Sequence, residues 1–208
     1  MPTRKWQVFV LPMVVLGLLT ACAAEPADSS PSAATPSATR TAIASPSATA
    51  SPSATATAGI ALPGACEEIY SAEMLASLQA TVPPLNDPDV TMLSTQNVDL
   101  LEQLDSGIPT LRCTWGGPSE YGMATVVSVI DPADGEAILS SLGAAGFACG
   151  DHAQGTMCRI EQRTVDYDDQ EMVSGETHYV RGNGWVSTSW LNVAPEGYTE
   201  DIVATLWG

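Results

Sequence analysis

The segment 23–64 limits where this chain can build a folded core. Ala, Ser, Thr and Pro fill 34 of its 42 positions, and the tetrapeptide Pro-Ser-Ala-Thr occurs three times. Such a segment has almost no large apolar side chain to bury, so it cannot offset the entropy that folding costs. Its prolines favour an extended, solvated backbone. We therefore expect a disordered linker over residues 22–64 and one folded module over residues 65–208, an ordinary size for a domain.

The residues before the linker divide in the way that an export signal does. Arg4 and Lys5 give a short positive region, and residues 8–19 form an apolar run. A helix that spans a membrane needs about 20 apolar residues, and this run is shorter. Four residues close it: Leu19, Thr20, Ala21 and Cys22.

These four residues resemble the lipobox of bacterial lipoproteins, in which a small residue precedes a cysteine that becomes acylated. The resemblance implies a signal peptide over residues 1–21, cleavage after Ala21, and a diacylglycerol with palmitate-type chains on Cys22. Because two or three acyl chains hold a membrane firmly, the mature protein would be anchored on the extracytoplasmic side of the cell membrane without spanning it. An ordinary signal peptide, with Cys22 as a bystander, is the alternative.

The linker would carry the module away from the membrane, over a mean span of roughly 35 Å if it behaves as a flexible coil. Segments rich in Ser, Thr and Pro are common acceptors of O-linked sugars, so the composition suggests a glycosylated stalk. A bare spacer without sugars explains the same composition equally well.

Four cysteines lie in the module: Cys66, Cys113, Cys149 and Cys158. An even number of cysteines in an exported domain predicts two disulfides, for which three pairings are possible. We favour Cys149–Cys158, because residues 151–155 are typical of a turn that would bring two strands together, and this leaves Cys66–Cys113. The rival interpretation is a zinc site of four thiolates. It is disfavoured because the chain has no C-x-x-C pair and an oxidising compartment removes thiolates.

The hydrophobic pattern of the module predicts an α+β fold. The capping residues Ser71, Asn97 and Thr199, together with helical spacing, predict a helical turn and four helices, at 66–70, 71–79, 97–104, 133–145 and from 199 onward. Alternating or valine-rich apolar runs predict strands, at 111–115, 123–130, 156–165, 177–181 and 185–193. The last two strands flank Gly182-Asn183-Gly184, a strong hairpin signal. We expect an antiparallel sheet of four to five strands with helices packed on one face.

The order of the module's cysteines and tryptophans carries a second resemblance. The module begins with Cys66, continues with a Cys-x-Trp strand at Cys113 and Trp115 and a later close pair of cysteines, and ends in a helix that closes with Leu206-Trp207. This order resembles a loose group of actinobacterial cell-envelope lipoproteins of unknown function. Some extracellular sensor domains of actinobacterial serine/threonine kinases have a similar plan. The resemblance implies a fold and a compartment, and it transfers no catalytic residue.

The module is strongly acidic, with 22 Asp and Glu residues against four arginines and a net charge of −18. This charge repels nucleic acid and anionic lipid headgroups, so we expect no nucleic-acid partner. It would attract cations, basic peptides or basic partner surfaces. Simple solubility of an exposed domain is the alternative explanation.

The densest acidic cluster contains Asp166, Asp168, Asp169 and Glu171. Calcium sites gather several carboxylates from one loop, but an EF-hand loop needs glycine at its sixth position, which is Glu171 here. Successive acids on a strand would also point to opposite faces. We therefore interpret the cluster as a solvated loop between two strands, and we predict no metal site and no cofactor.

His152 and His178 are the two histidines of the chain. A Ser–His–Asp triad needs one of them between a nucleophile and an acid, and the chain has no G-x-S-x-G motif. Disulfide pairing would leave no cysteine nucleophile in the module, and nothing singles out two of the 22 acidic residues as a glycosidase pair. The sequence therefore predicts no catalytic residue.

Trp185 and Trp190 differ by five positions in one predicted strand, so we expect them on opposite faces of the sheet. If helices cover one face only, one of the two indoles lies on the open face. An exposed aromatic ring there is a platform for a ligand, a sugar or a peptide. The alternative is that the long segment 83–96 packs over it.

Together these features predict a lipid-anchored module at the cell envelope that binds or senses a ligand and is not an enzyme. Its partner would be a cell-wall fragment, a small apolar molecule or another envelope protein. A divergent envelope hydrolase that uses carboxylates would instead place an acidic pair at the floor of a deep pocket. A purely structural surface protein would have neither a pocket nor a partner.

Overall fold

The computed structural model describes residues 59–208. The predicted signal peptide, Cys22 and nearly all of the predicted linker lie outside these residues. The domain begins earlier than the predicted boundary at residue 65, because the apolar side chain of Ile60 is buried against it. The Asn183 side chain accepts a hydrogen bond from the Ile60 N–H (2.7 Å) and donates one to the Ile60 carbonyl (3.0 Å).

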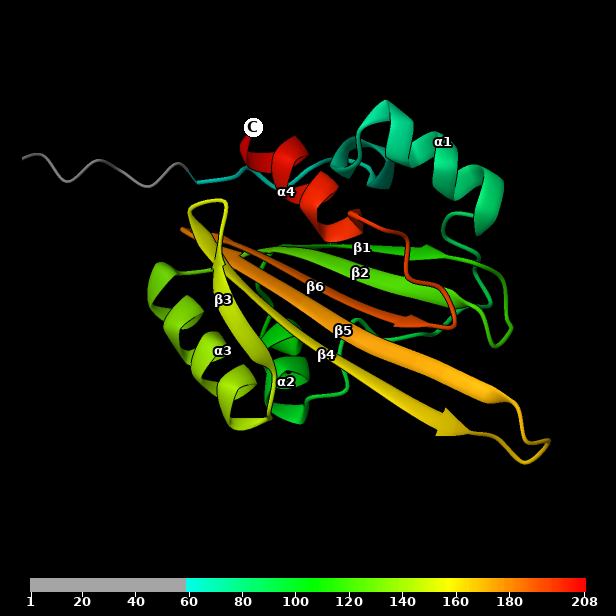
Figure 1. The fold of residues 1–208 in the computed structure, drawn as a ribbon. Helices are drawn as coiled ribbons and strands as arrows, with labels where there is room; N and C mark the ends of the chain where they lie inside the picture. The colour runs from blue at the N-terminus through cyan, green and yellow to red at the C-terminus, as the bar shows by residue number, and fades with distance from the viewer. Residues whose placement is uncertain (1–58) are drawn as a thin grey trace, which may run out of the picture. The chain divides into compact units, whose positions relative to one another are not determined.

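A six-stranded antiparallel sheet forms the centre of the domain (Figure 1). Its strands are β1 (Thr110–Trp115), β2 (Gly122–Val129), β3 (Ala148–His152), β4 (Gly155–Val165), β5 (Glu171–Arg181) and β6 (Gly184–Leu191). They lie in the order β1-β2-β6-β5-β4-β3, and every neighbouring pair is antiparallel. The predicted α+β class and antiparallel sheet are confirmed. The predicted count of four to five strands is too low, because β3 is short, exposed and without apolar alternation.

Within residues 59–208, four α-helices and a 3-10 helix pack on the sheet. They are η1 (Cys66–Ile69), α1 (Ala72–Thr81), α2 (Val98–Asp105), α3 (Pro132–Ala144) and α4 (Tyr198–Trp207). The Ser71 and Asn97 side chains accept backbone N–H groups at the starts of α1 and α2, as predicted. At α4 the preceding residue is Gly197 and not Thr199, so this helix starts without a side-chain cap.

The helices cover both faces of the sheet, so the prediction of helices on one face is wrong. Figure 1 shows α1 and α4 on one side, here called the α4 side, and α2 and α3 on the other, the α3 side. The cause lies in the neighbouring inner strands β2 and β6, in which nearly every residue is buried. Side chains that are buried on both faces of a strand need a cover on both faces of the sheet.

Each side of the sheet has its own hydrophobic core. On the α4 side, Val186 packs in one cluster with Leu78 of α1 and Ile202 of α4. On the α3 side, Trp185 packs in a second cluster with Leu142 of α3. Trp185 and Val186 are neighbours in β6 and serve different cores, because successive side chains of a strand point to opposite faces.

Two disulfides hold the domain together, and both match the predicted pairings. Cys66–Cys113 joins η1 to β1, and Cys149–Cys158 joins directly paired residues of β3 and β4. Disulfides form and persist in oxidising compartments, so they indicate an extracytoplasmic environment. No helix within residues 59–208 combines the length and the apolar character that crossing a membrane requires.

Candidate functional site

The predicted acidic cluster forms the turn between β4 and β5, at the far end of the long hairpin in Figure 1. The Asp166 carboxylate accepts the backbone N–H groups of Asp168 and Gln170, both at 2.8 Å. Glu171 forms an ion pair with Arg163 (2.8 Å). These carboxylates close the turn and pair across the hairpin. Over the part of the chain that the structure describes, no three potential metal ligands are grouped to hold an ion.

The two histidines lie on different sides of the sheet. The His152 ring, at the end of β3, contacts the ring of Tyr179, which belongs to the core of the α4 side, with 6.2 Å between ring centres. His178 is fully buried and contacts Phe147 and Trp185 in the core of the α3 side. The sheet therefore keeps the two histidines apart.

His178 belongs to a buried chain of hydrogen bonds. The Trp185 indole N–H donates to His178 Nδ1 (3.3 Å), and His178 Nε2 lies 3.2 Å from Glu176 Oε2. Glu176 also accepts from the Thr95 hydroxyl (2.7 Å) and from the Gln96 N–H (2.8 Å). Because Nδ1 is an acceptor, Nε2 carries the proton and donates it to Glu176, as in neutral histidine.

Burial and hydrogen bonding set the pKa values in this chain. Burial lowers the pKa of His178, and the hydrogen bond to Glu176 compensates for it only in part. Burial alone would raise the pKa of Glu176, but hydrogen bonds from His178, Thr95 and Gln96 outweigh it and hold this pKa below its ordinary value. A neutral imidazole next to an ionised carboxylate therefore ties β5 and β6 to the segment before α2.

Trp185 is not a ligand platform, because its side chain is completely buried on the α3 side. The His178 ring stacks on it with 6.1 Å between ring centres. The last residues of the segment 83–96 also pack on this side, where the Ser187 hydroxyl donates to the Ser94 carbonyl (2.9 Å), whereas Leu85 packs against the core of the α4 side. The prediction of a ligand platform is therefore wrong for Trp185. The end of the segment 83–96 packs on the same side of the sheet as this residue.

Trp190 lies on the α4 side and is only half-buried. Its indole lies against Gly175 of β5, because a β-carbon at Gly175 would come within 2.4 Å of the indole Cζ2. Only glycine leaves room for the ring in this position. Sequence alone singles out Trp190 but not Gly175, because the partner of a residue across a sheet depends on the strand register.

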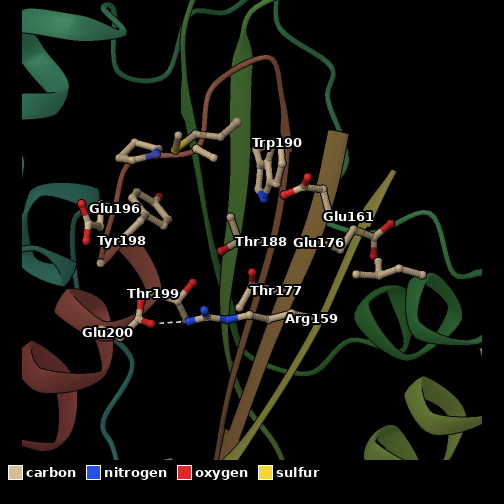
Figure 2. Close-up of a pocket in the computed structure, with 15 residues that line it drawn as sticks. Arg159, Glu161, Glu176, Thr177, Thr188, Trp190, Glu196, Tyr198, Thr199 and Glu200 are labelled. Atoms are coloured by element: carbon tan, nitrogen blue, oxygen red, sulfur yellow. Dashed lines mark hydrogen bonds and ion pairs between the residues drawn. The ribbon is translucent and has the colours of Figure 1, made fainter. Parts of the chain in front are cut away.

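Trp190 lines a hollow of about 470 Å³ on the α4 side of the sheet (Figure 2). Two rows of neighbouring residues underlie it: Arg159, Thr177 and Thr188 in one row, and Glu161, Gly175 and Trp190 in the other. The loop after β6 and the first turn of α4 form its wall. These six residues and this wall define the site, which is referred to below as the Trp190 hollow.

Two ion pairs frame the Trp190 hollow. The Arg159 guanidinium donates to Glu200 at the start of α4, as the dashed line in Figure 2 shows. Glu161 accepts from Arg163 (2.9 Å). Burial raises the pKa of Glu200, but the hydrogen bond and charge of Arg159 and a backbone hydrogen bond together outweigh it, so this pKa lies below its ordinary value. Glu200 is therefore ionised at neutral pH and keeps acceptor positions for a ligand.

A buried network of hydroxyl groups joins the wall of the Trp190 hollow to its floor. The Thr188 hydroxyl bonds to Thr125 (3.0 Å), and Thr125 bonds to the Tyr198 hydroxyl (2.8 Å). Tyr198 bonds in turn to Tyr70 (2.7 Å), which accepts from the Trp115 indole N–H (3.0 Å). Burial raises the pKa of Tyr70 to about 12 and that of Tyr198 well above its ordinary value. Both hydroxyls stay protonated at neutral pH and support the wall.

The groups of the Trp190 hollow suit the binding of a polar ligand. An aromatic surface, threonine hydroxyls and ion-paired carboxylates hold such a ligand by packing and hydrogen bonds. A carboxyl group that acts as a general acid needs a raised pKa, whereas Arg159 lowers the pKa of Glu200.

Compared with protein-family models, curated proteins and solved structures, the chain matches none of them.

Proposed function

We propose that this protein is a lipid-anchored, extracytoplasmic module that binds a ligand in the Trp190 hollow and does not catalyse a reaction. Three features support the proposal. The lipobox-like residues that end at Cys22 supply an anchor. The two disulfides suit an oxidising compartment. The hollow supplies the place for a ligand from the cell envelope.

The observation that carries the proposal is the position of Trp190. Trp115 and Trp185 are buried in the two cores, whereas Trp190, like Trp207 at the end of α4, is only partly buried. The Trp190 ring packs against Gly175, which fixes its position on the sheet. The hollow next to it, at about 470 Å³, falls within the range of about 300–1,000 Å³ that is common for small-molecule sites. A fixed indole next to polar groups is a suitable ligand surface.

Thermal unfolding of residues 23–208 tests the proposal, with the chain exported so that its disulfides form. The panel contains neutral oligosaccharides, muropeptides, lipids, basic peptides and calcium. A ligand at a hundred times its Kd adds about 2.7 kcal/mol to the free energy of unfolding. For a domain of this size, that raises Tm by about 5–10 °C.

Trp190→Ala should abolish this shift, because it removes the aromatic surface. Tyr167→Ala is the matched control, since Tyr167 is a fully exposed ring at the β4–β5 turn, and it should keep the full shift. A shift that survives in Trp190→Ala would contradict the assigned site. A panel without any shift would contradict ligand binding.

A further inference from the structure

The Trp190 hollow is a poor site for two classes of ligand. A wholly apolar ligand would strip water from Arg159, Thr177 and Glu161 without replacing their hydrogen bonds. An anionic ligand would meet the carboxylates of Glu161, Glu196 and Glu200, whereas the one arginine that lines the hollow, Arg159, already binds Glu200. The ligand therefore needs polar groups and no negative charge.

The hollow instead offers a flat apolar surface with charged groups beside it. Trp190, seated on Gly175, gives the surface. Glu161 lies in the same row of the sheet, and the Arg159–Glu200 pair lies at the neighbouring row (Figure 2). Charged donors and acceptors form stronger hydrogen bonds to neutral hydroxyls than uncharged groups do.

We infer that the ligand is a neutral saccharide, and this inference rests on the proposed function. The C–H face of one sugar ring packs on the Trp190 indole. Hydroxyl groups at the ring edge donate to the Glu161 and Glu200 carboxylates and accept from Arg159. Each class of group in the hollow then has a partner on the ligand.

The binding surface continues beyond Trp190. A second hollow of about 410 Å³ shares Glu161, Trp190 and Ala194 with the first and extends to Asn192 and Tyr121. The Tyr121 side chain is 59% exposed, so its ring is open to a ligand. A ligand that fills both hollows crosses the Trp190 indole, which favours an oligosaccharide over a single sugar.

Nuclear magnetic resonance of the indole N–H groups, on residues 23–208, tests this inference with trimers that differ in charge. The neutral trimers are chitotriose, cellotriose and maltotriose. The cationic trimer is fully deacetylated chitotriose, and the anionic trimer is trigalacturonic acid. The Trp190 signal is identified by its loss in Trp190→Phe. We expect at least one neutral trimer to shift this signal saturably and with little dependence on salt, and the anionic trimer to leave it in place.

Gly175→Ala is the sharpest variant, because it keeps the indole and removes its seat. Binding of the neutral trimer should weaken at least tenfold in Gly175→Ala and in Trp190→Ala, and should be unchanged in Tyr167→Ala. Thermal unfolding without a ligand shows whether each variant is folded. If Gly175→Ala does not fold, Trp190→Ala carries the test. The Trp190 side chain is only half-buried, so its removal disturbs the fold less.

Three outcomes would overturn the inference. A Trp190 signal that moves only with the cationic trimer, and only at low salt, would make the hollow a cation site and leave the proposed binding function standing. If no trimer moves the Trp190 signal but another class of the thermal panel binds through Trp190, the saccharide inference fails and the proposed binding function stands. If no class binds through Trp190, the proposed function fails together with the inference.

Discussion

Single side chains give the two sides of the sheet their different characters. On the α3 side, His178 fits between Trp185, which donates to it, and Glu176, which accepts from it. All three are sealed from water or nearly so. On the α4 side, the missing β-carbon of Gly175 lets Trp190 lie against the sheet. The α3 side therefore contains a closed polar chain within its core, whereas the α4 side leaves Trp190 in an open hollow.

The buried, neutral His178 makes the domain less stable at acidic pH. Its pKa in the folded domain lies below the ordinary value of 6.5, so below pH 6.5 the unfolded chain binds a proton that the folded domain does not. The free energy of unfolding then falls by up to about 1.4 kcal/mol per pH unit from this group. Glu176 acts in the same direction at lower pH, because its folded pKa lies below its ordinary value of 4.5.

Denaturant unfolding at pH 7.5, 6.5 and 5.5 measures this effect. His178→Gln should be less stable than the parent at pH 7.5, because the chain between Trp185 and Glu176 is broken, and its stability should change less with pH. Tyr167→Ala, a change at the exposed β4–β5 turn, should keep the parent's slope. Equal slopes for the parent and His178→Gln would contradict the assignment of the pH dependence to His178.

Among the elements, the helices are easier to predict from the sequence than the sheet. Ser71 and Asn97 lie directly before the helices that they cap, so a local pattern is enough to place α1 and α2. The strand β3 has no such pattern, because it is an exposed edge that a disulfide ties to β4. The cover on both faces depends on where distant helices pack, which no local pattern contains.

The sequence indicates some residues of the candidate site and not others. Trp190 stands out in the sequence because a large aromatic residue on a strand faces either a core or a ligand. Gly175, Arg159 and Glu200 do not stand out. They reach Trp190 through the register of β4 with β5 and of β5 with β6, and through the loop that returns α4 over the sheet. Long-range pairing of this kind cannot be read from neighbouring residues.

The two disulfides should contribute unequally to stability, because they close loops of different length. Cys66–Cys113 spans 47 residues of sequence and Cys149–Cys158 spans 9. Loop-closure entropy predicts a loss of roughly 4 kcal/mol without the first and roughly 2.7 kcal/mol without the second. Denaturant unfolding of the double variants Cys66→Ala/Cys113→Ala and Cys149→Ala/Cys158→Ala measures both. The reverse order of stability would contradict this entropic account.

For the whole molecule, the balance of charge is one-sided. The four arginines of the domain are engaged: Arg159 and Arg163 with carboxylates, and Arg112 and Arg181 with backbone carbonyls. With 22 acidic residues, most carboxylates have no arginine to meet. A surface of this kind repels other acidic surfaces and stays soluble. It also repels anionic headgroups, so the proposed membrane attachment would depend on the lipid at Cys22.

Cys22→Ala should release the full chain from membranes of a bacterial host, because the lipid would be the only attachment. Fractionation should find the variant in the soluble extracytoplasmic fraction, and labelling with radioactive palmitate should be lost. Ser30→Ala, a change in the same small-residue segment, should leave the protein in the membrane fraction. A Cys22→Ala protein that remains with membranes would contradict the proposed anchor.

The chain enters the domain at one end of β6, and Trp190 lies near the other end of this strand. At the turn between β5 and β6, the Asn183 side chain forms two hydrogen bonds with the backbone of Ile60. From this turn, β6 runs from Gly184 toward Trp190. At about 3.4 Å per residue, Trp190 lies roughly 20 Å along β6 from this turn. The Trp190 hollow therefore lies toward the end of β6 that is remote from the point where the chain enters the domain. A ligand bound there would leave the Asn183–Ile60 contact free, so ligand binding and entry of the chain use different ends of β6.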